Sequence, residues 1–159
     1  LKRNTPQNIV IGGAAGAIPP MVGWAAVTGS VDLPALYLFT IVFFWTPPHF
    51  WALALMIQDD YADAGVPMLP VVVGEERTVQ NIFMYSLALI ALTILFAASD
   101  AVGLIYLGSA VVLGGFFIHL AWKLKRDYSV RRAKHLYLYS LLYLALLFAV
   151  MLADSVFHF

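Results

Sequence analysis

The stretch LYLFTIVFFWTPPHFWALALMI, residues 36–57, decides the fold. It contains no Asp, Glu, Lys or Arg, and a helix of roughly 20 apolar residues crosses the hydrocarbon layer of a membrane. Similar apolar runs cover residues 8–28, 82–98, 102–122 and 136–157. Backbone groups inside lipid must be paired within the chain, and an α-helix pairs them by itself. The sequence therefore predicts an all-α fold, a polytopic transmembrane helix bundle.

The composition supports the membrane assignment. Apolar residues make up 62% of the chain and charged residues 11%, and the mean hydropathy is +0.86. These values lie outside the usual range of soluble domains. The formal net charge is zero and there is no long basic run, so no nucleic acid partner is expected. Because the chain contains no cysteine, we expect no disulfide, thiolate metal site or cysteine nucleophile.

The basic residues indicate which way the spans run. Lys and Arg occur only before the first span, between the second and third, and between the fourth and fifth: Lys2, Arg3, Arg77, Lys123, Lys125, Arg126, Arg131, Arg132 and Lys134. Lysine and arginine favour the cytoplasmic side of a membrane. We therefore predict that residues 58–81 form a cytoplasmic loop of a protein in the bacterial inner (cell) membrane, or in the mitochondrial inner membrane of a eukaryote.

The first residues show no signal-peptide pattern. The chain begins with Leu1, and two basic residues follow at once without an apolar core and a cleavage site of their own. We interpret residues 1–159 as one transmembrane domain that is a fragment of a longer protein.

An acidic cluster follows the span at 36–57. Asp59 and Asp63 are four residues apart and Asp60 and Asp63 three apart, so each pair shares a face if the helix continues. Magnesium needs one or two carboxylates and takes phosphate oxygens and waters as its other ligands. The alternative is a solvated loop that caps the helix, although acids at the carboxyl end of a helix oppose its dipole.

A second polar group precedes the first span in LKRNTPQN, residues 1–8. Lys2 and Arg3 stand before a helix start, where cations and free N–H groups favour an anion. The alternative is that both are ordinary flanking cations of a membrane span.

His49 is the one histidine inside the second span, which contains no Asp, Glu, Lys or Arg. Pro47 and Pro48 precede it and are expected to kink or unwind the helix, freeing carbonyl groups. An ionisable residue within a membrane indicates a functional site. Alternatively, a neutral His49 pairs with one of the freed carbonyls.

Three strings in this order resemble one family: LKRNTPQNIVIGGAAGAIPPMVGW from residue 1, WTPPHFWALAL from residue 45 and DDYADAGVPMLPVVVG from residue 59. Together they closely resemble the heme O synthases of the UbiA prenyltransferase superfamily. The resemblance covers nearly half of the chain, up to Gly74. It implies a bundle of about nine helices, of which this chain supplies roughly the last five.

The resemblance implies transfer of farnesyl from farnesyl diphosphate to heme B, which gives heme O, with Mg²⁺ as cofactor and heme A synthase as a partner. The superfamily holds magnesium diphosphate with two acidic motifs. The first, of the form N-x-x-x-D-x-x-x-D, does not occur here, so the fragment alone is expected to be inactive.

Roles follow for individual residues. As metal ligands we predict Asp59, Asp60 and Asp63, with Asp60 as first choice because it stands in the family's DY pair. Lys2 and Arg3 bind diphosphate, and Arg suits a bidentate grip. The predicted substrate-binding residues are Asn8, Tyr61, His49, Trp45 and Trp51, with His49 a ligand of heme iron or a contact of a heme propionate.

Two other functions are alternatives. One is a UbiA-type prenyltransferase that acts on an aromatic quinone precursor. The other is a transporter or membrane assembly subunit, in which the broken helices line a translocation path.

Overall fold

The computed structural model describes residues 7–99 and 101–157. Every regular element in these two ranges is a helix, in the order α1 (Asn8–Gly16), α2 (Ile18–Thr28), α3 (Leu33–Met56), α4 (Gln58–Asp63), α5 (Leu69–Phe96), α6 (Leu104–Arg126) and α7 (Val130–Phe157). The predicted all-α fold is confirmed.

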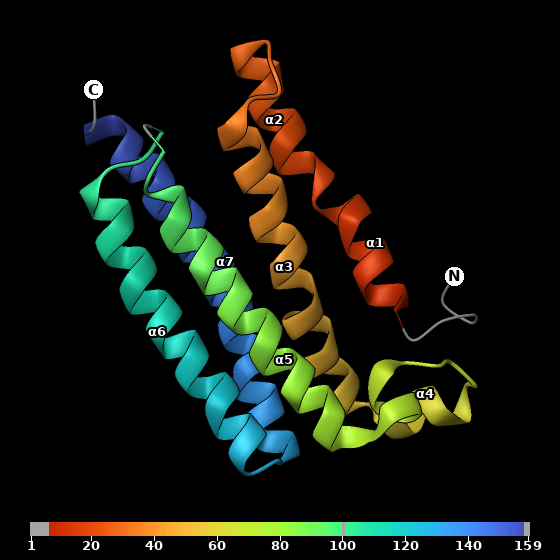
Figure 1. The fold of residues 1–159 in the computed structure, drawn as a ribbon. Helices are drawn as coiled ribbons and strands as arrows, with labels where there is room; N and C mark the ends of the chain where they lie inside the picture. Colours follow the sequence, from red (N-terminus) through yellow and green to blue (C-terminus); the bar gives the residue numbers. More distant parts are fainter. Residues whose placement is uncertain (1–6, 100, 158–159) are drawn as a thin grey trace.

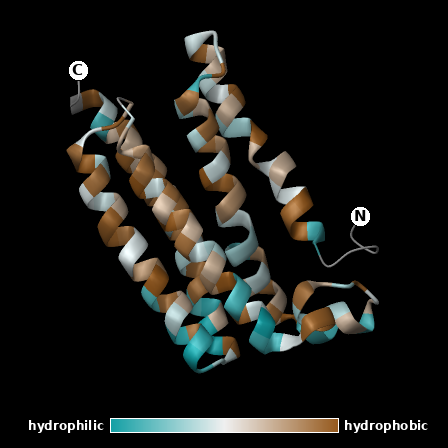
Figure 2. Cartoon of the chain, viewed as in Figure 1, coloured by the Kyte–Doolittle hydropathy of each residue, from teal (hydrophilic) through white to brown (hydrophobic). Residues whose placement is uncertain are grey.

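Five segments are long and apolar enough to cross a membrane, the number that the sequence predicts: Asn8–Thr28, Leu33–Met56, Leu69–Phe96, Leu104–Arg126 and Val130–Val156. Figure 2 shows hydrophilic residues gathered at the end of the bundle where α4, the start of α5 and the α6–α7 connection lie. The chain is thus a multi-pass membrane protein with one strongly polar end.

Much of the segment expected to be a loop, residues 58–81, is helical. It contains α4 and the beginning of α5, which starts at Leu69 rather than near residue 82. Gly74 (φ 82°, ψ 171°) interrupts α5, and Thr78 Oγ1 donates to the Gly74 carbonyl at 2.7 Å. Glu75 and Glu76 then lie in the first turn of the continuing helix, where its dipole favours acids. Most of the polar segment 58–81 is therefore helical rather than a loop.

Helix α3 lies at the centre of the bundle. It packs against α1, α2, α5 and α7, while α6 packs against α5 and α7. The helices α3, α5, α6 and α7 therefore form a closed ring. Among the described helices α1 and α2 pack only against α3 and each other, and they lie at the edge opposite α6 (Figure 1).

The ring contains the core. Its largest fully buried side chains are Trp51, Tyr106, Tyr143, Phe96, Phe117, Ile41, Leu55, Ile82, Leu89, Leu124, Leu136 and Leu147. A small residue brings α6 close to α5, because a Cβ added at Gly114 would lie 2.7 Å from Cγ2 of Ile90. Small residues at such contacts let membrane helices approach closely.

Buried polar groups also link the ring. The Tyr106 hydroxyl donates to the Thr93 carbonyl at 3.0 Å, and the Thr93 hydroxyl lies 3.0 Å from the hydroxyl of Tyr143. Near the carboxyl end of α7, the Asp154 carboxylate accepts a hydrogen bond from the backbone N–H of Gly103 and another, at 3.2 Å, from that of Tyr106. The first turn of α6 is therefore capped by a side chain of α7.

The proline pair does not open α3. The helix continues without a break from Leu33 to Met56, and Pro47, Pro48 and His49 are all buried. The expected unwinding is therefore absent from this described segment. Proline is tolerated in membrane helices where neighbouring groups pair or pack around the altered backbone.

Candidate active site

The acidic residues lie on a separate short helix. Ile57 (φ −126°, ψ 34°) ends α3, and α4 leaves it in a new direction beneath the start of α1 (Figure 1). Asp59 and Asp60 fall in the first turn of α4, where the helix dipole stabilises negative charge. The expectation that acids oppose a helix dipole here was wrong, because α3 ends before them.

The turn after α4 folds the chain back toward α1 and α3. The N–H of Val66 donates to the Tyr61 carbonyl at 2.9 Å, and that of Gly65 to the Ala62 carbonyl at 3.0 Å. Gly65 has φ 63°, a left-handed conformation that glycine adopts without strain at the end of a helix. This turn brings Val66 and Met68 to the same cavity as Tyr61.

An apolar groove of about 510 Å³ lies between α1 and α3. Its walls are Asn8, Ile9, Gly12, Gly13, Gly16, Val42, Trp45, Thr46, Phe50, Tyr61, Val66 and Met68. A Cβ added at Gly12 or Gly16 would meet no atom within 4 Å, so these glycines leave space open. The volume is in the range of small-molecule sites.

The groove joins three of the predicted site residues. Asn8 from α1, Trp45 from α3 and Tyr61 from α4 all line it. Asp59 and Asp60 are exposed on α4, directly before Tyr61. The cavity is thus mainly apolar, with Asn8 and Tyr61 among its polar lining residues. The acids Asp59 and Asp60 lie next to it on α4.

The two predicted tryptophans occupy different sides of α3. Trp45 lines the groove, and its Nε1 donates to the Ser140 carbonyl of α7 at 2.8 Å. Trp51 is buried against α5, with its ring centroid 5.2 Å from that of Tyr85, and is not among the groove residues. Phe50, partly exposed, lines the groove beside Trp45.

His49 faces α7. Its ring stacks between those of Trp45 and Tyr137, at centroid distances of 4.3 and 4.7 Å. Its Nδ1 lies 2.7 Å from Ser140 Oγ, and that hydroxyl donates to the Tyr137 carbonyl at 2.6 Å. We assign Nδ1 as the donor, because the Ser140 proton is already used, which leaves the lone pair on Nε2. The partner of His49 is a hydroxyl, not a carbonyl freed by proline.

The remaining predicted ligands are the three acids of α4 and the two cations before α1. Within residues 7–99 and 101–157 no three His, Asp or Glu side chains gather as a metal site. Asp59, Asp60 and Asp63 are exposed, and magnesium can bind through one or two carboxylates when phosphate supplies other oxygens. The donor set therefore fits a site shared with a phosphate ligand. Lys2 and Arg3 lie outside the described residues.

The comparisons with known proteins decide the family. The family model described as the UbiA prenyltransferase family matches residues 1–154. The chain belongs to the UbiA prenyltransferase family. This agrees with the resemblance that the three sequence strings carry.

Curated relatives of this UbiA chain share one name. It is 60% identical over 98% of its length to protoheme IX farnesyltransferase from Roseiflexus sp. (strain RS-1), of which it covers 29%. It is 56% identical to the proteins of that name from Gloeothece citriformis (strain PCC 7424) and Bordetella petrii, of which it covers 49% and 52%. The chain thus spans about half, or less, of these relatives. No solved structure matches it.

Two contacts from other elements meet the chain where α3 ends and α4 begins, and the sequence did not predict them. Gln58 Nε2 donates to Glu75 Oε1 at 2.7 Å, and the Tyr128 hydroxyl donates to the Leu55 carbonyl at 3.3 Å. Burial and the nearby carboxylates of Glu75 and Asp59 raise the pKa of Tyr128 to about 12. Tyr128 lies 73 positions after Leu55 in the sequence, so no local pattern connects it with the end of α3.

Proposed function

We propose that the complete protein is a protoheme IX farnesyltransferase that transfers farnesyl from farnesyl diphosphate to a vinyl group of heme B. The observation that carries this proposal is the acidic helix α4 next to the apolar groove between α1 and α3. The name that the relatives share favours heme over an aromatic acceptor. The present chain would supply the groove and one of two acidic motifs.

The reaction requires a charged leaving group and a protected carbocation. The allylic C–O bond breaks, diphosphate leaves with the electron pair, and the heme vinyl group bonds to C1 of the farnesyl cation. Water then adds to the new cation on the heme side and loses a proton, giving the hydroxyl of heme O. Magnesium would neutralise charge on the diphosphate when bound.

The acids and cations of this chain would bind the diphosphate end. Asp59 and Asp60, with Asp63 behind them, would hold Mg²⁺, while Lys2 and Arg3 would bind diphosphate oxygens. Tyr61 and Asn8 line the groove, and each can donate a hydrogen bond to the same group. Such donors stabilise a leaving group where charge develops.

The groove would hold the prenyl chain. Burial from water stabilises each methylene by about 0.8 kcal/mol, and the apolar walls Ile9, Val42 and Met68 provide that burial. The rings of Trp45 and Phe50 also line the groove. Aromatic faces attract cations, so these rings suit the developing farnesyl cation.

His49 would contact the acceptor. Its assigned tautomer leaves Nε2 as the ligand atom for heme iron, and Ser140 fixes the ring through Nδ1. We further propose that the acidic end faces the cytoplasm, in the bacterial inner membrane or its mitochondrial equivalent, and that heme A synthase receives the product.

The test uses the full-length enzyme in detergent with farnesyl diphosphate and Mg²⁺. Asp60→Asn or Lys2→Ala should abolish transfer to heme B and leave heme binding nearly intact. The control Glu76→Gln removes an exposed acid at the same end and should keep wild-type turnover. Wild-type-like turnover in both test variants would rule out the diphosphate assignment, and transfer to hydroxybenzoate instead of heme B would indicate the quinone-precursor function.

The role of His49 has its own readout. His49→Ala should change the heme absorption spectrum and weaken heme affinity. An unchanged spectrum and affinity would leave His49 as a packing residue between Trp45 and Tyr137.

A further inference from the structure

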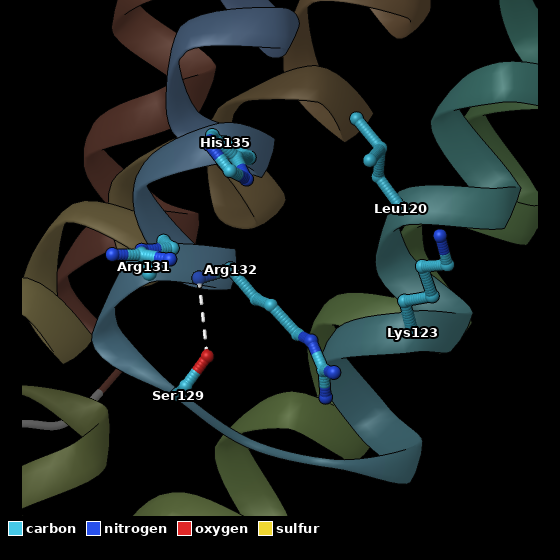
Figure 3. A pocket seen from close by; sticks show the side chains of 6 residues that line it. All are labelled: Leu120, Lys123, Ser129, Arg131, Arg132 and His135. Carbon is cyan, nitrogen blue, oxygen red and sulfur yellow. Dashed lines mark hydrogen bonds between the residues drawn. The ribbon is translucent and has the colours of Figure 1, made fainter.

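A basic pocket of about 380 Å³ lies at the polar end of α6 and α7. Its lining residues are Leu120, Lys123, Ser129, Arg131, Arg132 and His135. Figure 3 shows Leu120 and Lys123 on α6. Arg131, Arg132 and His135 lie in the first turns of α7, and Ser129 directly precedes that helix. None of these residues lines the groove between α1 and α3.

The pocket carries uncompensated positive charge. Arg132 forms an ion pair with Asp127, and its backbone N–H donates to Ser129 Oγ at 3.3 Å, the dashed line in Figure 3. Lys123 and Arg131 are exposed, and no ion pair involves either one within residues 7–99 and 101–157. Lys123 and Arg131 therefore add two full charges to the lining of this hollow, and neither forms an ion pair with a carboxylate of the described residues.

An apolar surface continues from the pocket along the same two helices. Phe116 lies one turn before Leu120 on α6 and its ring contacts that of Tyr139 on α7, at a centroid distance of 4.8 Å. Phe116 is exposed, as are Leu138 and Leu142 farther along α7. A cationic hollow thus adjoins an exposed apolar surface formed by two membrane-spanning helices.

We propose that this pocket binds the phosphate headgroup of an anionic phospholipid such as phosphatidylglycerol. Basic pockets between membrane helices at the lysine- and arginine-rich side bind anionic headgroups. The adjoining apolar surface favours a lipid over a soluble anion, because acyl chains can cover Phe116 and Leu142 while Lys123 and Arg131 bind the phosphate. The proposal does not depend on the farnesyl transfer reaction.

The test measures lipid binding to the delipidated full-length protein by native mass spectrometry, with phosphatidylglycerol and phosphatidylcholine as probes. Wild-type protein should bind phosphatidylglycerol more tightly than phosphatidylcholine. The double variant Lys123→Gln/Arg131→Gln should weaken phosphatidylglycerol binding by about 30-fold, since each cation at an anionic surface changes affinity roughly fivefold.

The matched control is Arg77→Gln/Lys134→Gln, which removes two exposed cations that do not line the pocket. It should change phosphatidylglycerol affinity less than threefold, and both double variants should retain the wild-type melting temperature. Equal binding of the two lipids, equal losses in the two double variants, or displacement of the lipid by millimolar inorganic phosphate or pyrophosphate would each overturn the proposal.

Discussion

The two sides of α3 differ in how much of each helix the protein itself covers. In the most apolar window of Asn8–Thr28, 11% of residues are buried, against 39% in that of Leu69–Phe96. On the first side α1 and α2 meet only α3, and the 510 Å³ groove stays open. On the other side α5, α6 and α7 close a ring with α3. The packed core of this chain therefore lies on the α5, α6 and α7 side of α3, and the groove lies on the α1 side.

The largest effect is expected where the ring is packed most tightly. Gly114→Ala should lower the free energy of unfolding by about 2 kcal/mol, the usual cost of overpacking a core, because the new Cβ would meet Ile90 at 2.7 Å. Thermal unfolding in detergent measures the change. The neighbouring Gly115 has no atom within 4 Å of an added Cβ, so Gly115→Ala should leave the melting temperature unchanged or raise it. Equal losses in both variants would contradict this packing contact.

A substitution in the groove on the α1 side of α3 should change the kinetics of the enzyme rather than its stability. Under the proposed function, in which the groove holds the prenyl chain, Gly12→Leu should fill part of the groove and raise KM for farnesyl diphosphate in the full-length enzyme about tenfold, which corresponds to roughly two displaced methylenes. Its melting temperature should stay at the wild-type value. Gly23→Leu is the control, because Gly23 also has open space around it but does not line the groove. A normal KM for Gly12→Leu would place the prenyl chain elsewhere.

The smallest effect is expected near the end of α3, where the connection between α6 and α7 contacts it. Tyr128→Phe removes the hydrogen bond to the Leu55 carbonyl and should cost about 1 kcal/mol of stability. The raised pKa of Tyr128, about 12 against an ordinary 10.0, means that the folded state keeps the neutral hydroxyl. In the wild-type protein, the stabilisation that comes from the neutral Tyr128 hydroxyl is therefore complete below pH 10 and is lost as the pH rises from 10 to about 12.

Unfolding measured across that window distinguishes the variant from the wild type. Tyr128→Phe should lose less stability than wild type between pH 10 and 12. Parallel pH profiles would show that Tyr128 does not titrate in the way its carboxylate neighbours Glu75 and Asp59 predict.

Apolar runs predicted the helical bundle and its five spans because the membrane fixes both length and polarity. The start of α5 was missed, since Glu75 and Glu76 have the polarity of a loop while Gly74 makes them the first turn of a helix. The proline pair caused the opposite error, because it predicted a break in a helix that is continuous. Pro47 and Pro48 favour a break in an isolated helix, yet α3 continues through them among its neighbours.

The candidate site was only partly accessible to sequence reasoning. Asn8, Trp45 and Tyr61 were selected from the sequence and line one groove. The side of α3 on which each ring lies depends on tertiary packing. The sequence therefore could not show that Trp45 lines the groove while Trp51 lies in the core. The same holds for Ser140, which contacts both Trp45 and His49, and for Tyr128, because hydrogen bonds between distant helices leave no periodic pattern.

The Asp154 cap has a consequence for biosynthesis. Gly103 and Asp154 are separated by 51 positions, so a ribosome must finish most of α7 before the first N–H groups of α6 receive their carboxylate partner. Until then the first turn of α6 lacks this carboxylate partner. The order of translation therefore makes the arrival of α7 the step that completes α6.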